Sequence, residues 1–389
     1  MSVIVTNARN RIAYNVVRSL GQKGIDVYTA DFVKRSMSFS SRYSKGRFLY
    51  PSPFTEQEAF IGALIENIKK VEAHALIPVY EETFLISKYK STLEKHVKLA
   101  VPDYEQILTA HNKDRWSSIA LDLGIPVPRS YTIAQAKAEA RALNYPVLLK
   151  PRQGGGGWAI TQADSSDELL RLLDHNDVNG VGQERFFAQE KINGEVVCVA
   201  MLMSHGRYRA KVAYKQLRDY PVNCGQATLR ISVRNERAEA NLQRLLEHLN
   251  WHGVCQADFV VDAKTAAPYL IDLNPRFWGS LAQALASGVD FPYLYYKLIM
   301  NGDVTPVEGF KTGVVTRWLG GDLRGFLPHL RASESRLGFL KDFFFPAIRA
   351  SYYDDFSLAD PLPFLAWTSD MLIRSLTGAG HEGLEGVWE

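Results

Sequence analysis

The chain has 389 residues, 46% hydrophobic and 22% charged, so it is long enough to bury the cores of two or three domains. Its net charge of +3 is too small to indicate a nucleic-acid-binding surface, and no nucleic-acid partner is expected. Three scattered cysteines, Cys198, Cys224 and Cys255, lack C-x-x-C spacing, which argues against a disulfide framework and favours a reducing, cytoplasmic location. We expect neither a signal peptide nor a transmembrane segment, because residues 1–6 begin a strand and no uncharged apolar run reaches membrane-spanning length.

The first hundred residues alternate between strand and helix patterns. Residues 2–6 are a β-branched run, residues 10–23 have apolar side chains at helical spacing, and residues 24–31 form a second strand. A strand–helix–strand unit of this length predicts a parallel sheet. Asn7 to Arg11 stand where a dinucleotide-binding fold would carry its glycine fingerprint, so that function is disfavoured.

A helix is predicted over residues 56–70, and the strand over residues 75–80 ends at Glu81 and Glu82. Ligands of open α/β sheets bind at the carboxyl ends of strands, so one of these glutamates is a candidate substrate contact. The alternative is that both are carboxylates in the first turn of a helix, where they stabilise its dipole. The sequence leaves both interpretations open.

A linker near Pro102 leads to predicted helices at 112–123 and 134–143 and then to an apolar strand that ends in Lys150. Four glycines follow, Gly154, Gly155, Gly156 and Gly157. Without Cβ atoms, their backbone N–H groups can close over a polyphosphate, and Lys150 would add a positive charge. A glycine run is also typical of flexible linkers, but the flanking strand and Trp158 disfavour that interpretation.

The second half of the central region is predicted to be mostly strands. After a helix over 167–173, the expected strands are 186–192, 195–203, 208–215, 226–233, 255–262 and 269–274, with one helix over 236–250. The loop that begins at Lys215 contains Arg218, and both cations are candidates to hold a carboxylate or phosphate.

Asp272 and Asn274 are two residues apart on a predicted strand, so their oxygen ligands lie on the same face. Asp258, on a neighbouring strand, can complete a site for Mg²⁺ or Mn²⁺, which prefer such ligands. Arg276 follows, and its guanidinium is shaped to hold phosphate or carboxylate oxygens. The alternative is that Asp272, which is followed by Asn-Pro, only begins a turn.

Taken in order, these segments resemble the ATP-grasp superfamily of carboxylate–amine and carboxylate–thiol ligases, and the resemblance covers roughly residues 1 to 300. It implies an α/β protein, α+β in its grasp half. The implied domains are a Rossmann-like N-terminal domain over residues 1–102, an ATP-grasp domain over 103–305 with lobes at about 103–185 and 186–305, and a helical C-terminal extension over 306–389.

The resemblance also implies site residues. The nucleotide would contact Lys113, Lys150, the four glycines, and a hinge strand that contains Glu190, Lys191, Ile192 and Glu195. Asp258, Asp272 and Asn274 match the metal positions, and Arg276 matches the arginine that contacts the transferred phosphate. Many family members have Glu where this chain has Asp272, so here the shorter side chain requires a closer approach to the metal.

The expected activity is an ATP- and Mg²⁺-dependent ligation of a small-molecule carboxylate to an amine through an acyl phosphate, with ADP and phosphate released. Two alternatives remain open: a carboxylase-type or thiol-ligating relative, and a non-catalytic ATP-binding module. A homodimer is compatible with this family.

Beyond residue 305 the resemblance fades, and residues 323–374 are rich in aromatic residues, including Phe343, Phe344 and Phe345. The favoured interpretation is a helical subdomain that packs on the ligase core. The alternative is an interfacial surface for peripheral contact with a membrane, a lipid-linked substrate or a partner, since Arg331, Arg336, Lys341 and Arg349 lie close by.

Overall fold

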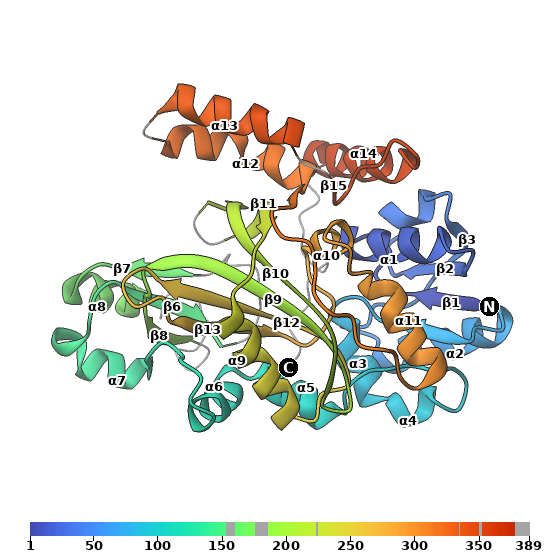
Figure 1. The fold of residues 1–389 in the computed structure, drawn as a ribbon, viewed down its shortest axis with the longest axis horizontal. Coiled ribbons are helices and arrows are strands. Elements are labelled where there is room, and N and C mark those ends of the chain that lie inside the picture. Colours follow the sequence, from blue (N-terminus) through green and yellow to red (C-terminus); the bar gives the residue numbers. More distant parts are fainter. Residues whose placement is uncertain (153–159, 176–185, 223–224, 334, 350–351, 378–389) are drawn as a thin grey trace.

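The computed structural model describes all residues except 153–159, 176–185, 223–224, 334, 350–351 and 378–389 (Figure 1). The described chain contains three β-sheets with helices around them. No helix in the described part of the chain is both long enough and apolar enough to cross a membrane.

The N-terminal domain is a four-stranded parallel sheet in the order β3-β2-β1-β4, which confirms the predicted parallel topology. Its elements are β1 (Ser2–Val5), α1 (Arg11–Gly21), β2 (Asp26–Asp31), the 3₁₀ helix η1 (Met37–Ser40), β3 (Ser44–Leu49), α2 (Gln57–Lys70) and β4 (Ala75–Ile77). The Asn10 side chain caps α1 by accepting from the backbone N–H of Ile12, and Val16, Val17 and Leu20 turn its apolar face into the core.

The first lobe of the central region has a four-stranded sheet in the order β5-β8-β6-β7. Helices α3 (Glu82–Lys88), α4 (Lys90–Leu93), α5 (Tyr104–His111) and α6 (Lys113–Asp122) lead into it. The lobe itself consists of β5 (Ser130–Thr132), α7 (Ile133–Ala138), η2 (Ala140–Ala142), β6 (Val147–Pro151), β7 (Thr161–Ala163), α8 (Ser166–His175) and β8 (Phe186–Glu190). Strand β8 pairs with β6, so the lobe extends to Glu190 and not to residue 185 as the sequence predicted.

The second lobe is built on a seven-stranded sheet in the order β13-β12-β9-β10-β11-β14-β15. Its elements are β9 (Gly194–Ser204), β10 (Arg207–Tyr220), β11 (Gln226–Ser232), α9 (Glu236–His248), β12 (Gly253–Asp262), β13 (Pro268–Asn274), α10 (Leu281–Ala286) and α11 (Phe291–Asn301). Strand β10 continues to Tyr220, so Lys215 and Arg218 lie on a strand and not in the predicted loop.

The C-terminal extension contains β14 (Val315–Arg317), α12 (Leu319–Ala332), α13 (Arg336–Arg349), β15 (Tyr352–Tyr353) and α14 (Leu362–Thr377). Most of it is helical, as predicted, but β14 and β15 add to the edge of the second-lobe sheet beside β11. Helices α12 and α13 stand out from the body of the molecule (Figure 1). One buried core joins the N-terminal domain to the second lobe, because Val3 and Val16 pack in the same cluster as Ala200 and Trp278.

Candidate active site

Four polar side chains form a square on one face of the hairpin β12–β13. Asp258 is directly opposite Asp272 in the antiparallel register, and Gln256 is directly opposite Asn274. Residues two apart on each strand share a face, so all four side chains point the same way. The Gln256 amide donates to Asp258 Oδ1 at 2.6 Å, and the Asn274 amide donates to Gln256 Oε1 at 2.9 Å.

Two lysines from the first lobe face this square. Lys113 begins α6, and its Nζ lies 3.7 Å from Asp272 Oδ1. Lys150 lies near the end of β6, is buried, and donates to Gln189 Oε1 at 2.7 Å. The predicted nucleotide lysines and metal ligands are therefore brought together although Lys113 and Asp272 are 159 residues apart in the sequence.

The charges in this cluster perturb one another. Burial raises the pKa of Asp258 to about 6, and repulsion from the neighbouring Asp272 carboxylate adds to the increase. Burial lowers the pKa of Lys150 to about 8, and the nearby Lys113 lowers it further. A pair of neighbouring carboxylates beside a pair of neighbouring lysines is typical of sites that bind a cation and a polyanion together.

Arg276 bridges this site to the N-terminal domain. Its Nε donates to Glu81 Oε1 at 2.9 Å, its Nη1 donates to the carbonyl of Phe277 at 3.0 Å, and its guanidinium carbon lies 4.2 Å from the centre of the Tyr80 ring. Glu81 stands just after β4, so the carboxyl end of the N-terminal sheet faces the candidate active site. Glu81 is ion-paired with Arg276, and its contact with a substrate stays a prediction.

Glu82 has a different environment. It is fully buried, and its carboxylate accepts hydrogen bonds from the Asn7 amide at 2.9 Å and the Tyr50 hydroxyl at 2.9 Å. Burial raises the pKa of Glu82. These contacts tie the start of α3 to the segments that follow β1 and β3, which is a structural role.

Sequence reasoning missed two residues of the site. Gln256 bridges Asp258 and Asn274, and its position two residues before Asp258 was the available signal. His111 ends α5, two residues before Lys113, and burial lowers its pKa while the charges of Glu81 and Asp272 oppose that shift. Its Nε2 is buried and, within the described residues, makes no hydrogen bond. Nothing in the sequence distinguished it from an ordinary helix histidine.

The two other predicted catalytic cations have different partners in the structure. Lys215 forms an ion pair with Glu195, one of the predicted nucleotide contacts. Arg218 donates to both carboxylate oxygens of the buried Asp322, at 2.9 and 2.7 Å. Because its guanidinium is held by the C-terminal extension, Arg218 is better explained as an anchor than as a catalytic residue.

The predicted hinge residues connect the two lobes between β8 and β9. The Glu190 carboxylate accepts from the Tyr131 hydroxyl at 3.1 Å, and the Lys191 backbone N–H donates to the carbonyl of Pro146 at 3.0 Å. Ile192 lies in the short segment between the two strands. The predicted phosphate loop, Gly154 to Gly157, lies outside the described residues.

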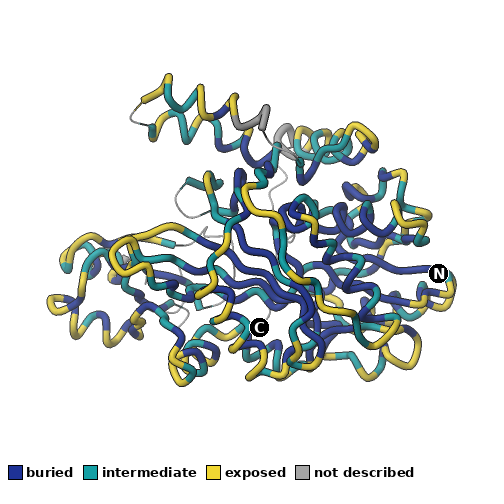
Figure 2. Tube along the Cα trace, in the orientation of Figure 1, coloured by how far each residue is buried: buried dark blue, intermediate teal, exposed yellow. Residues whose placement is uncertain are grey.

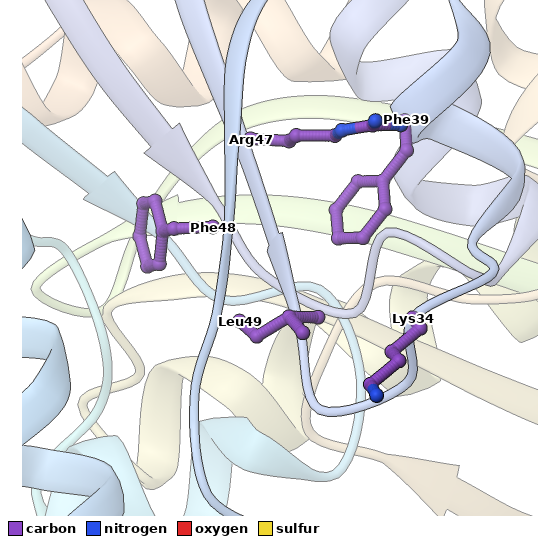
Figure 3. A pocket seen from close by; sticks show the side chains of 5 residues that line it. All are labelled: Lys34, Phe39, Arg47, Phe48 and Leu49. Atoms are coloured by element: carbon purple, nitrogen blue, oxygen red, sulfur yellow. The ribbon is translucent and has the colours of Figure 1, made fainter.

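Within the described residues, no three His, Cys, Asp or Glu side chains are grouped as metal ligands. The square has two carboxylates, so a cation there would also need the Asn274 amide oxygen and groups from its substrate. A separate hollow of about 410 Å³ lies on the N-terminal domain, lined by Lys34, Phe39, Arg47, Phe48 and Leu49 (Figure 3). It adjoins β3, at the opposite edge of the sheet from β4, and is therefore distinct from the candidate active site.

Comparison with known proteins identifies the central region. Residues 110–280 match the family model described as ATP-grasp domain, so this part of the chain is an ATP-grasp domain. The matched segment contains Lys113, Lys150, the square of polar side chains and Arg276.

Several solved structures share the fold over about 80% of this chain. Biotin carboxylase from Campylobacter jejuni, in a complex described as β-γ-ATP, has 19% identity and a TM-score of 0.66, covering 80% of this chain and 74% of that one. L-amino acid ligase from Bacillus licheniformis has 15% identity and a TM-score of 0.60, covering 79% and 77%. N5-carboxyaminoimidazole ribonucleotide synthetase from Thermus thermophilus has 16% identity and a TM-score of 0.59, covering 81% of each chain. At these identities the likeness establishes the fold alone.

Proposed function

We propose that this protein is an ATP-dependent ligase that activates a substrate carboxylate as an acyl phosphate and joins it to an amine. The observation that carries the proposal is the convergence of Asp258, Asp272, Asn274, Lys113 and Lys150, with Arg276 beside them. An arginine held at the edge of such a site suits phosphoryl transfer, because it can stabilise charge on a transferring phosphoryl group.

The donor set fits Mg²⁺, or Mn²⁺. Burial raises the pKa of Asp258, repulsion from Asp272 adds to the increase, and a divalent cation would relieve that repulsion. Asp258, Asp272 and Asn274 would hold the ion, which would neutralise charge on the ATP phosphates. A related carboxylase domain from Hydrogenobacter thermophilus, with 17% identity and a TM-score of 0.63 over 80% of this chain, was crystallised with MgADP and bicarbonate, which supports the choice of nucleotide and metal.

In the proposed reaction, a carboxylate oxygen of the substrate attacks the γ-phosphorus of ATP, and ADP leaves. The amine nitrogen then attacks the acyl carbon and loses a proton, and phosphate leaves as the amide forms. Lys113 and Lys150 balance the charge of the nucleotide, while Glu81 holds Arg276 toward the phosphoryl group. The protein contributes mainly positioning and charge stabilisation.

The test is stoichiometric release of ADP and phosphate in a screen of candidate acids and amines, with hydroxylamine added to trap an acyl phosphate as a hydroxamate. Asp272→Asn is expected to reduce turnover by about 10² or more, because it removes one of two carboxylates at the proposed metal site. Its circular dichroism spectrum should match that of the wild type. AMP and pyrophosphate as the products, or full activity of Asp272→Asn, would contradict the proposal.

A carboxylase-type reaction is the second candidate, since biotin carboxylases are among the structural neighbours. Bicarbonate would then be the carboxylate that is phosphorylated. ADP release that depends on bicarbonate and needs no organic acid would favour this alternative.

A further inference from the structure

The C-terminal extension exposes an unusual number of apolar side chains, and it lies beyond the residues that match the ATP-grasp family. Large hydrophobic residues that are exposed elsewhere in the described chain are few and scattered: Met1, Leu49, Leu121 and Leu217. Ten more lie between residues 323 and 373. Figure 2 shows exposed positions along the two helices that project from the body, α12 and α13.

One side of α12 is firmly anchored to the sheet. Asp322 accepts from Arg218, from Arg317 Nε at 2.6 Å and from Thr228 Oγ1 at 2.9 Å, and Gly325 is buried beside it. At 3.6 residues per turn, Leu323 and Leu327 each lie about 160° around the helix from Gly325. They are 54% and 55% exposed, so the side of α12 that faces away from the protein is apolar.

Helix α13 repeats this arrangement. Phe343 is buried and packs on Phe326 of α12, with ring centroids 4.8 Å apart. Phe345 lies about 160° around the helix from Phe343, and Leu337 and Phe344 lie about 100–120° from it. The exposed fractions of Leu337, Phe344 and Phe345 are 82%, 59% and 59%.

The two helices are anchored through the same two arginines. The guanidinium carbons of Arg218 and Arg317 lie 5.1 and 4.4 Å from the centre of the Phe343 ring, and both arginines also hold Asp322. Helices α12 and α13 therefore pack on each other and on the same two arginines, and each helix exposes apolar side chains on the side away from its packed residues. We call the exposed residues on those sides the hairpin face: Leu323, Leu327, Leu337, Phe344 and Phe345.

Two exposed basic residues lie on the outward sides of the helices. Lys341 is about 160° around α13 from Phe343, and Arg331 is four residues after Leu327 on α12. Arg336 is exposed too, but it is seven residues before Phe343 and so lies on the packed side of α13. Residues 319–349 contain five Arg or Lys against three Asp or Glu. One of those acids, Asp322, is buried and already paired with two arginines. Exposed Leu and Phe beside Lys and Arg on a helical surface are typical of proteins that lie in the headgroup region of an anionic bilayer.

We propose that the hairpin face docks the protein on an anionic lipid surface, with Phe344, Phe345 and the leucines inserted among the lipids and Arg331 and Lys341 at the headgroups. A second copy of the chain suits this face less well. A twofold interface sets the same patch against itself, and it would bring the basic residues of both copies together. The proposal goes beyond the ligase activity and does not depend on it.

The experiment is sedimentation of the full-length protein with vesicles of phosphatidylcholine alone or phosphatidylcholine mixed with phosphatidylglycerol. Wild-type protein should bind the mixed vesicles, and added salt should weaken that binding because exposed charges are screened. The triple variant Leu337→Ser/Phe344→Ser/Phe345→Ser should bind these vesicles with an affinity at least about tenfold lower. It lacks the three apolar side chains that would insert into the lipid. The matched control is Leu121→Ser, which removes a side chain that is also 60% exposed but lies on α6.

Lys341→Glu provides a second variant that leaves the apolar residues intact, and it should lose most of the preference for phosphatidylglycerol. Circular dichroism melting would establish that both variants are folded. The proposal is overturned if wild-type protein does not bind the mixed vesicles, or if Lys341→Glu and the triple variant bind as wild type does. Light scattering could instead show that the wild type is a dimer, that the triple variant is a monomer and that vesicles change neither. That result would assign the hairpin face to self-association.

Discussion

Asp354 joins three parts of the chain, and Asp354→Asn should destabilise the protein severely. Its carboxylate forms an ion pair with Arg230 of β11, both side chains being fully buried, and lies 3.4 Å from Nε of Arg11 at the start of α1. Its backbone carbonyl accepts from the Asn15 amide at 2.8 Å. The substitution keeps the shape of the side chain but leaves two buried guanidinium groups without their anionic partner.

Breaking a buried ion pair by neutralising one partner typically costs about 3–5 kcal/mol. The other Arg230 contacts, to Thr316 Oγ1 at 2.9 Å and to the carbonyl of Ala227 at 2.8 Å, satisfy hydrogen bonds but cannot balance the charge. We therefore expect a loss of about 3–5 kcal/mol in the free energy of unfolding, measured by urea denaturation as a lower midpoint at an unchanged slope.

Two comparisons make this measurement specific. The double variant Arg230→Met/Asp354→Leu should be more stable than Asp354→Asn, because only one buried guanidinium, Arg11, then loses Asp354 instead of two. Asp26→Asn breaks the solvent-exposed pair with Lys45 and should leave the midpoint unchanged. A midpoint for Asp354→Asn equal to that of the wild type would refute the reasoning.

Two further predictions concern the site and the response to pH. Glu81→Gln should reduce kcat by about 10–100-fold with little change in the KM for ATP, because Arg276 loses the carboxylate that orients it. An unchanged kcat would show that this contact is dispensable. His252 stacks on His205 with ring centroids 4.0 Å apart, and burial lowers its pKa from 6.5 to about 4. The unfolded state therefore binds more protons between these values, so this residue makes stability fall as pH drops from 6.5 to 4, by up to about 3 kcal/mol. The variant His252→Phe should show a smaller loss than the wild type over this window, and parallel stability curves would contradict the assignment.

Local patterns predicted much of the fold. The alternation around Asp272 and Asn274 fixed which side chains share a face, and the strand–helix–strand pattern at the start of the chain predicted a parallel sheet. Strand β3 was missed because its sequence, Ser-Lys-Gly-Arg-Phe-Leu, lacks a run of β-branched residues and alternates between half-buried and exposed positions at the edge of the sheet.

Long-range pairing could not be predicted in the same way. Arg218 looked like a ligand-binding cation, but its partner Asp322 lies 104 residues away, and no local pattern couples the two. The pair Glu81–Arg276 spans 195 residues, and whether Glu81 or Glu82 faced the site depended on how the turn after β4 was packed. Such contacts depend on how the domains pack, which single-sequence periodicity does not encode.

The pairing of β14 with β11 has a practical consequence for anyone who shortens this protein. The resemblance to ligases fades near residue 305, which suggests a natural point for truncation, but strand β14 and its neighbour β15 lie beyond it. Cutting there would turn β11 into an open edge with unpaired backbone groups, which invites strand-to-strand aggregation. It would also remove Asp322 and Asp354, so Arg218 and Arg230 would be left as uncompensated cations. The minimal expressible unit is therefore larger than the ATP-grasp match, and it includes the extension at least as far as β15.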